Sequence, residues 1–163
     1  MNKPEVVITH HAVSAKHHTV EDVDQWHKQR WPNFKSNMGF WVGYHYVIDW
    51  DGSVTQTRGL NEEGAHTIGM NTKSIGVCFM GNFDNHYPSP EQMESWDTLY
   101  SELRDDFNNL PTFPHRSYAT KSCHGGLLED GYFQDYFQKT TLIEKLKQII
   151  ALYTQILSLR RMK

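Results

Sequence analysis

The chain has 163 residues, of which 38% are hydrophobic and 13% aromatic, which predicts one folded domain rather than a disordered chain. The mean hydropathy is -0.65, and no apolar run approaches the ~18 residues of a membrane span. Residues 1–139 hold 11 Lys and Arg against 18 Asp and Glu, a net charge of −7, whereas residues 140–163 carry five basic residues and one acidic residue, a net charge of +4. Because phosphate binding needs a basic face, the acidic body argues against nucleic acid as a partner.

The N-terminus and the cysteine count bear on the compartment and on the chemistry. Met1 to Glu5 lacks the charged-then-apolar layout of a secretory signal peptide, so we expect the protein to be cytoplasmic as synthesised. Two cysteines, Cys78 and Cys123, are too few for a disulfide framework. Ten histidines are a large share for this length, and histidine is the commonest metal ligand.

Secondary structure can be predicted along most of the chain. Runs of β-branched and aromatic residues predict strands at 6–9, 41–48, 53–56 and 74–80. Helices are expected to begin after the N-cap residues Thr19 and Ser89, and two further helical segments are expected around 129–138 and 141–159. Residues 59–72 and 111–123 read as loops, the second with a short extended piece.

Three residues have the chemistry of zinc ligands. His10 follows the first predicted strand, and His115 and Cys123 lie eight residues apart on one predicted loop. Zinc takes imidazole and thiolate ligands, and a catalytic zinc site leaves one position open for water. Spacing alone leaves two interpretations open: a zinc site, or a strand-end histidine, a surface histidine and a small buried thiol without a common role.

The order of several short motifs is more specific than any motif alone. In order, the chain contains Val7-Ile8-Thr9-His10-His11, Trp41-Val42-Gly43-Tyr44-His45-Tyr46, Asp51-Gly52, Gly64-Ala65-His66, Asn71, Ser74-Ile75-Gly76-Val77, and His115 followed by Lys121-Ser122-Cys123. This ordered set resembles the type-2 N-acetylmuramoyl-L-alanine amidases, a family that includes bacteriophage amidase-lysozymes and animal peptidoglycan recognition proteins. The resemblance covers roughly residues 5–137 and implies a single α/β domain, with a central mixed β-sheet flanked by helices. We therefore divide the chain into an amidase domain at 1–139 and a C-terminal amphipathic helical tail at 140–163.

The resemblance also implies a catalytic site. His10, His115 and Cys123 match the ligands of a Zn²⁺ cofactor. Tyr44 matches the tyrosine that faces the nucleophilic water, and Lys121 matches the catalytic lysine of the phage-type members. Relatives that bind without hydrolysis usually lack the cysteine ligand, so its presence here favours an enzyme.

The implied partner is peptidoglycan, and the implied reaction is hydrolysis of the amide between N-acetylmuramic acid and L-alanine. His66 and Asn71 lie in the loop that lines the groove for glycan and stem peptide, unless that loop is merely solvated. A wall-cleaving enzyme without a signal peptide must be released by lysis or by another export route, which resembles a phage or prophage endolysin. A non-hydrolytic peptidoglycan-binding module and a cytoplasmic muropeptide-recycling amidase are the alternatives.

Three further histidines adjoin the implied site residues. His11 and His45 alternate with site residues on their strands, so their side chains should face the opposite side, and His45 should be buried and structural. His124 stands where many relatives have proline. Its side chain either adds a polar group beside the metal or points away and is exposed, and the second is favoured because adjacent side chains usually diverge.

The tail carries its own pattern. Leu142, Leu146, Ile149, Tyr153 and Ile156 follow the alternating four-three spacing of a coiled-coil seam, and Ile143, Ile150 and Leu157 widen the apolar face. Three interpretations are open: a helix packed on its own domain, a self-association helix, or a basic amphipathic helix that meets an anionic membrane through Arg160, Arg161 and Lys163. The first is favoured because the pattern is shorter than the three to four heptads typical of a coiled coil.

Overall fold

A computed structural model describes residues 1–161, and the side chains of residues 1–155. Its centre is a five-stranded sheet in the order β3-β2-β4-β1-β5. The strands are β1 (Val6–His11), β2 (Tyr46–Ile48), β3 (Val54–Gln56), β4 (Ser74–Phe79) and β5 (Thr112–Pro114). Strand β1 pairs in parallel with β4 and β5, β2 pairs in parallel with β4, and β3 is antiparallel to β2. The predicted mixed sheet is therefore confirmed.

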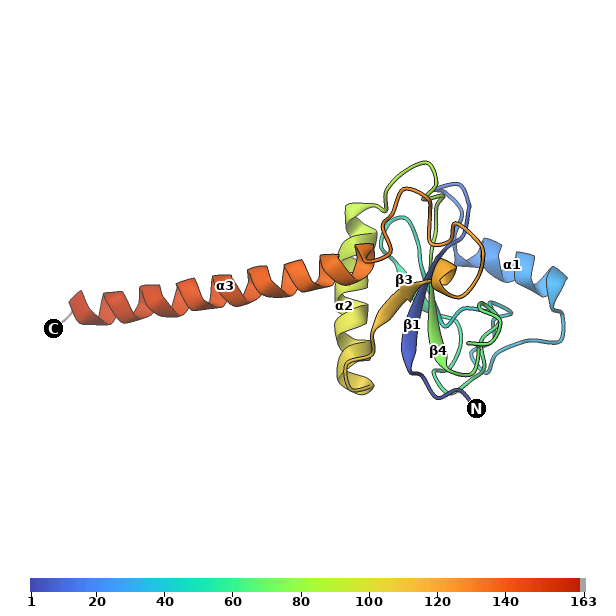
Figure 1. Cartoon of the computed structure of the whole chain (residues 1–163), viewed down its shortest axis with the longest axis horizontal. Helices are drawn as coiled ribbons and strands as arrows, with labels where there is room; N and C mark the ends of the chain where they lie inside the picture. The colour runs from blue at the N-terminus through green and yellow to red at the C-terminus, as the bar shows by residue number, and fades with distance from the viewer. Residues whose placement is uncertain (162–163) are drawn as a thin grey trace.

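Helices cover both faces of this sheet (Figure 1). Helix α1 (Val20–Arg30) packs its two buried valines over the face that carries Val47 and Cys78. Helix α2 (Pro90–Asp106) and the first turns of α3 (Tyr132–Arg161) pack over the opposite face, with Trp96 and Phe133 in the larger core. Because both faces are covered, every residue of β1 and β4 is buried.

The predicted helix starts are confirmed by their caps. Ser89 Oγ accepts the backbone N–H of Gln92 at 3.0 Å, and Gln92 Oε1 accepts the backbone N–H of Ser89 at 3.1 Å. At α1, the carboxylate of Asp22 accepts the backbone N–H of Thr19 at 2.9 Å. These side chains satisfy N–H groups that would otherwise lack partners in the first turn of each helix.

The strand predicted at 41–48 is shorter in the structure, where it spans Tyr46–Ile48. Gly43, earlier in the predicted strand, makes its backbone hydrogen bonds outside the sheet: its N–H donates to Nδ1 of His27 in α1 at 2.9 Å, and its carbonyl accepts the N–H of Ala65 at 2.8 Å. A β-rich sequence is thus held as a loop between α1 and the segment around residue 65, because tertiary hydrogen bonds replace the sheet ladder.

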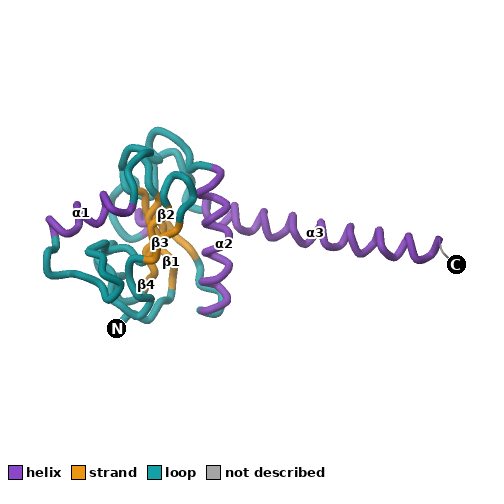
Figure 2. The backbone as a smooth tube through the Cα atoms, turned by 180° about the vertical axis from the view of Figure 1, so that it is seen from behind, coloured by secondary structure: helices purple, strands orange, loops and turns teal. Residues whose placement is uncertain are grey.

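The prediction of two C-terminal helical segments is wrong, because α3 is one uninterrupted helix from Tyr132 to Arg161. Beyond its first turns it projects away from the domain, as both views show (Figures 1 and 2). The favoured interpretation, a tail helix packed on its own domain, is therefore also wrong. Five residues on which that interpretation and its alternatives drew lie outside the described side chains: Ile156, Leu157, Arg160, Arg161 and Lys163. Within residues 1–161, no helix combines the length and the apolar character needed to cross a membrane.

Candidate metal centre

The strand register brings the first two candidate ligands together. Strands β1 and β5 are parallel neighbours, with Thr9 paired to Pro114. The next residue in β1 is His10, and the residue after the end of β5 is His115, which begins a short 3-10 helix (His115–Ser117), so the two histidines lie side by side at the carboxyl edge of the sheet. Their ring centres are 4.6 Å apart, and both side chains are buried.

The third candidate ligand, Cys123, lies on the loop that follows His115 and is close to both histidines. Cys123 Sγ lies 3.7 Å from Nδ1 of His10. One ligand atom each from His10, His115 and Cys123 lies within 4.8 Å of the others. Ligand atoms around a tetrahedral zinc ion are about 3.3–3.6 Å apart, given its usual bond lengths. The three donors therefore fit a metal ion after a small contraction, and their chemistry, two imidazoles and a thiol, is that of a zinc site.

Arg116 holds the two loop ligands in place, although nothing in the sequence pattern singled it out. Its backbone N–H donates to the carbonyl of Cys123 at 2.7 Å, which ties the residue after His115 to the third candidate ligand. Its guanidinium donates to the carbonyls of Gly125 and Leu128. The backbone bond closes the loop between the two ligands, and the guanidinium ties that loop to the segment that follows Cys123.

Burial sets the protonation of the candidate ligands. It lowers the pKa of His10 well below the ordinary value of 6.5, so that this imidazole is neutral at neutral pH, as a metal ligand must be. Burial and then the charge of Lys121 lower the pKa of His115 as well. Burial raises the pKa of the Cys123 thiol to about 11, and the positive charge of Lys121 opposes that shift.

Tyr44 and Lys121 both lie close to the ligand set. The ring centre of Tyr44 is 5.0 Å from that of His10. Burial, and next the neighbouring thiols Cys78 and Cys123, raise the pKa of Tyr44 well above 10, so the phenol keeps its proton at neutral pH. Lys121 is exposed, yet its charge lowers the pKa of His115 and opposes the rise of the Cys123 pKa. The structure thus brings the three candidate ligands and Tyr44 together, and Lys121 lies near enough for its charge to act on two of the ligands.

His66 contacts His10 on the side of the ring that faces away from Cys123. Its Nδ1 is 3.0 Å from Nε2 of His10, the ring nitrogen opposite the one beside Cys123. The ring packs flat against the sheet because Gly76 leaves room for it: a Cβ on Gly76 would lie 2.7 Å from the imidazole. His66 therefore contacts a candidate metal ligand.

Asn71 is bound within its own loop. Its carboxamide oxygen accepts the backbone N–H groups of His66 at 2.9 Å and of Thr67 at 2.8 Å. These two bonds fix the backbone that carries the His66 ring. Contact of either side chain with glycan or stem peptide stays a prediction.

The other histidines near the site are buried and serve the scaffold. His45 Nδ1 accepts the N–H of Gly76 at 3.0 Å, and His11 Nδ1 accepts that of Phe83 at 3.0 Å, so the prediction that His45 is a buried structural residue is confirmed. His124 points away from the candidate ligands, as favoured, but it is buried rather than exposed. Its Nδ1 lies 2.6 Å from the hydroxyl of Thr9, and its Nε2 lies 3.2 Å from the carbonyl of Glu129.

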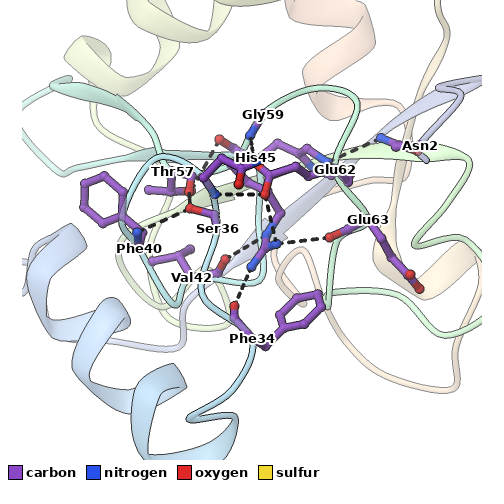
Figure 3. A network of polar contacts seen from close by, with 12 residues as sticks. Asn2, Phe34, Ser36, Phe40, Val42, His45, Thr57, Gly59, Glu62 and Glu63 are labelled. Carbon is purple, nitrogen blue, oxygen red and sulfur yellow. Dashed lines mark hydrogen bonds and ion pairs between the residues drawn. The ribbon is translucent and has the colours of Figure 1, made fainter.

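A buried arginine, which the sequence did not single out either, supports the loop around Tyr44. Arg58 donates from Nε to the carbonyl of Val42 at 3.1 Å and from Nη2 to that of Phe34 at 2.9 Å. The same network reaches Glu62 and His45 (Figure 3), where Nε2 of His45 lies 3.1 Å from the Glu62 carbonyl. The guanidinium substitutes for the missing strand partners of this segment.

The buried histidines make the metal-free chain sensitive to acid. Burial lowers the pKa of His45 and of His124 to about 4 in the folded state. As the pH falls below 6.5, these two side chains therefore become protonated in the unfolded chain while they are still neutral in the folded chain. We expect the free energy of unfolding to fall by on the order of 1 kcal/mol per histidine between about pH 7.5 and 5.5. Burial raises the pKa of Asp49 to about 6, which offsets part of that loss.

Urea denaturation at the two pH values, in the presence of a chelator, measures this effect. The variant His124→Asn should show a smaller loss of stability on acidification than the unmodified chain. An unfolding free energy that is equal or higher at the lower pH would contradict the assignment of these histidines as neutral in the folded state.

The fold and these residues define an α/β domain with a candidate His-His-Cys metal site at the carboxyl edge of its sheet. The family model described as N-acetylmuramoyl-L-alanine amidase matches residues 1–126. The chain belongs to this family.

Individual relatives agree with that assignment. The chain is similar to the endolysins of Enterobacteria phage K11 and Escherichia phage T7, each 33% identical over 110 residues, or 64% of this chain and 68% of the relative. Among solved structures, it is similar to the N-acetylmuramoyl-L-alanine amidase LysC from Clostridium intestinale, with a TM-score of 0.70 and 27% identity over 86% of this chain and 87% of the other. PGRP-SA from Apis mellifera has a TM-score of 0.68 and 26% identity, with 80% of each chain covered.

Proposed function

We propose that this protein is a zinc-dependent enzyme that hydrolyses the amide bond between N-acetylmuramic acid and L-alanine in peptidoglycan. The observation that carries the proposal is the convergence of His10, His115 and Cys123 within 4.8 Å, beside Tyr44 and Lys121. Membership of the amidase family and similarity to phage endolysins support the reaction, and the presence of the cysteine supports turnover rather than binding alone.

Each side chain has a role in this proposal. When bound, zinc polarises the substrate carbonyl and lowers the pKa of a coordinated water to about 7. The ammonium of Lys121 stabilises the negative charge that develops on the amide oxygen, because a compact point charge next to the site is worth most in the transition state. Tyr44, which stays protonated, can donate a hydrogen bond to the attacking water or pass a proton to the leaving amine.

His66 acts through His10 in this scheme. Nδ1 of His10 lies beside Cys123 and would be the atom that holds the metal, so Nε2 would carry the ring proton and donate a hydrogen bond to Nδ1 of His66. Such a partner fixes the tautomer and orientation of a metal-bound imidazole. We therefore assign His66 as a positioning residue, in addition to the groove contact expected from the sequence.

Replacing His66 with alanine should weaken zinc binding by about 10-fold to 100-fold while leaving the three ligands in place. Competition with a chromophoric chelator measures the zinc affinity directly and does not depend on turnover. His17→Ala, at an exposed histidine, is the matched control and should bind zinc like the unmodified chain. An unchanged affinity in His66→Ala would remove His66 from the metal site.

We further assign the protein to cell-wall lysis of the phage type, acting on the wall after its release from the cytoplasm. The support for this role is the similarity to phage endolysins. A muropeptide-recycling amidase would cut the same bond, but it would prefer small soluble muropeptides to intact walls.

The test uses purified cell walls with the metal-loaded chain, with and without a chelator. We expect new N-terminal alanine to appear at the rate at which the walls clear, and both signals to stop with the chelator and return with added zinc. Binding to walls without new amino termini would show a non-hydrolytic module. Activity on soluble muropeptides alone would favour the recycling role.

A further inference from the structure

The distal part of α3 exposes a wide, largely apolar surface. Its larger apolar side chains between residues 142 and 153 have exposed fractions from 40% to 64%. The residues are Leu142, Ile143, Leu146, Ile149, Ile150, Leu152 and Tyr153, and we call them the apolar face of α3. An apolar surface of this extent on a projecting helix points to an interaction site.

The apolar face is on the side of the helix opposite to the side that packs on the domain. Phe133 and Phe137 pack into the core, and Thr140 donates a hydrogen bond to Asp97 of α2 at 2.6 Å. With about 100° per residue, Leu142 and Tyr153 are nearly half a turn away from these three residues. The apolar side chains of α3 therefore lie on one side of the helix where it packs on the domain and on the opposite side where it projects from the domain.

The side that continues toward α2 is polar. The groove between α2 and α3 is lined on the α3 side by Thr140, Glu144 and Gln148, among others. Bending the helix back toward α2 would bury these polar groups and leave the apolar face in water. The apolar face is thus arranged to meet a surface outside the domain.

The width of the apolar face favours a lipid surface over a second helix. From Leu152 to Ile143 the apolar arc spans about 180° of the helix, which is wider than the a/d seam buried in a two-stranded coiled coil. A helix that lies in the plane of a bilayer surface buries about half of its circumference.

The charges of residues 140–163 also favour a lipid surface over a second copy of the helix. Residues 140–163 carry five basic residues and a single acid, Glu144, which already pairs with Lys147 at 2.6 Å. Two copies would bring like charges together, without the opposite charges at flanking positions that set pairing in coiled coils. At an anionic bilayer, the exposed Lys145 can extend its stem along the apolar face and reach the head groups.

The projecting part of α3 is long enough to hold its basic residues away from the negative charge of the domain. Residues 141–161 span about 31 Å at the rise of an α-helix. Charges are screened over about 8 Å at physiological ionic strength. The net charge of −7 on residues 1–139 therefore does not prevent the helix from reaching a negatively charged surface.

We infer that residues 141–155 form an interfacial helix that binds an anionic lipid bilayer, with the apolar face of α3 at the acyl boundary and the lysines among the head groups. The helix lies on the bilayer and does not span it. The inference depends on the shape and charge of α3 and not on the amidase activity, so either can fail without the other.

Sedimentation of the full chain with lipid vesicles tests the inference. Binding to vesicles of phosphatidylcholine with phosphatidylglycerol should exceed binding to phosphatidylcholine alone by at least about tenfold, and it should weaken as salt is added. The double variant Leu146→Glu/Ile150→Glu should lose at least about 100-fold in binding, because two apolar side chains can no longer be buried.

The matched control places the same two charges on the other side of the helix. Gln148→Glu/Ala151→Glu adds equal negative charge, so it should lose some electrostatic attraction yet bind clearly better than the apolar-face variant. Equal losses in the two variants would overturn the inference, as would the failure of the unmodified chain to sediment with anionic vesicles. The unmodified chain could instead fail to bind vesicles but self-associate in analytical ultracentrifugation. If that association were lost in Leu146→Glu/Ile150→Glu, the apolar face of α3 would be assigned to a second copy of the chain.

Discussion

Cys123→Ser is expected to lose both the bound zinc and the hydrolysis of cell walls. Cys123 supplies the only sulfur of the described three-residue ligand set, and a neutral hydroxyl is a far poorer zinc ligand than a thiolate. The two remaining histidines cannot by themselves hold a catalytic zinc ion, which normally has three protein ligands. Metal analysis should find about one zinc per chain in the unmodified protein and close to none in the variant.

A second cysteine provides the control for this experiment. Cys78 is buried on β4, opposite His10 in the strand register, but it is not one of the three converging ligand residues. Cys78→Ala should therefore keep the zinc, even if it lowers stability by creating a small cavity. A Cys123→Ser protein that retains one zinc per chain and the full rate would refute the proposed ligand set.

The sequence was sufficient to predict the parts of the site that follow from strand ends and ordered motifs. A β-branched run placed His10 at the end of a strand, and the family resemblance joined it to His115 and Cys123. Parallel pairing of β1 with β5 is the physical reason that this worked, because it brings two strand ends to the same edge. That pairing links segments about a hundred residues apart and leaves no periodic signal in either of them.

The supporting residues could not be predicted in the same way. Arg58 and Arg116 act through bonds to main-chain carbonyls, and a carbonyl acceptor carries no signature of its residue type. His66 was assigned to a loop that lines the groove, and its contact with His10 depends on the space that Gly76 leaves beside the ring in β4. Such relations arise only when the loop is folded over the sheet.

The tail shows how one pattern can be correct while its interpretation fails. The four-three spacing did predict a helix with an apolar stripe. Its packing could not be read from the spacing, because the core-facing residues Phe133 and Phe137 and the later apolar face lie on opposite sides of one continuous helix. A change of side of this kind becomes visible only when the phase of the whole helix is known.

Lys121→Ala is expected to keep the zinc and the affinity for cell walls while turnover falls by about 10²-fold to 10³-fold. Lys121 lies two residues before Cys123, and its charge acts on the pKa of both His115 and Cys123 without being one of the three ligands. The loss of one group that stabilises the developing oxyanion typically costs that factor in rate. Release of N-terminal alanine from walls measures turnover, while metal analysis and wall sedimentation measure what should remain unchanged.

A matched variant separates this role from a general effect of charge. Lys73→Ala removes another exposed lysine, outside the candidate metal centre, and should hydrolyse walls at the unmodified rate. Because Lys121 is exposed, its replacement should not disturb the core, and thermal unfolding of the two variants should agree closely. If Lys121→Ala hydrolyses walls as fast as Lys73→Ala, the ammonium next to the ligands is only a surface charge, and stabilisation of the oxyanion must come from another group, with the Tyr44 hydroxyl the first to test by Tyr44→Phe.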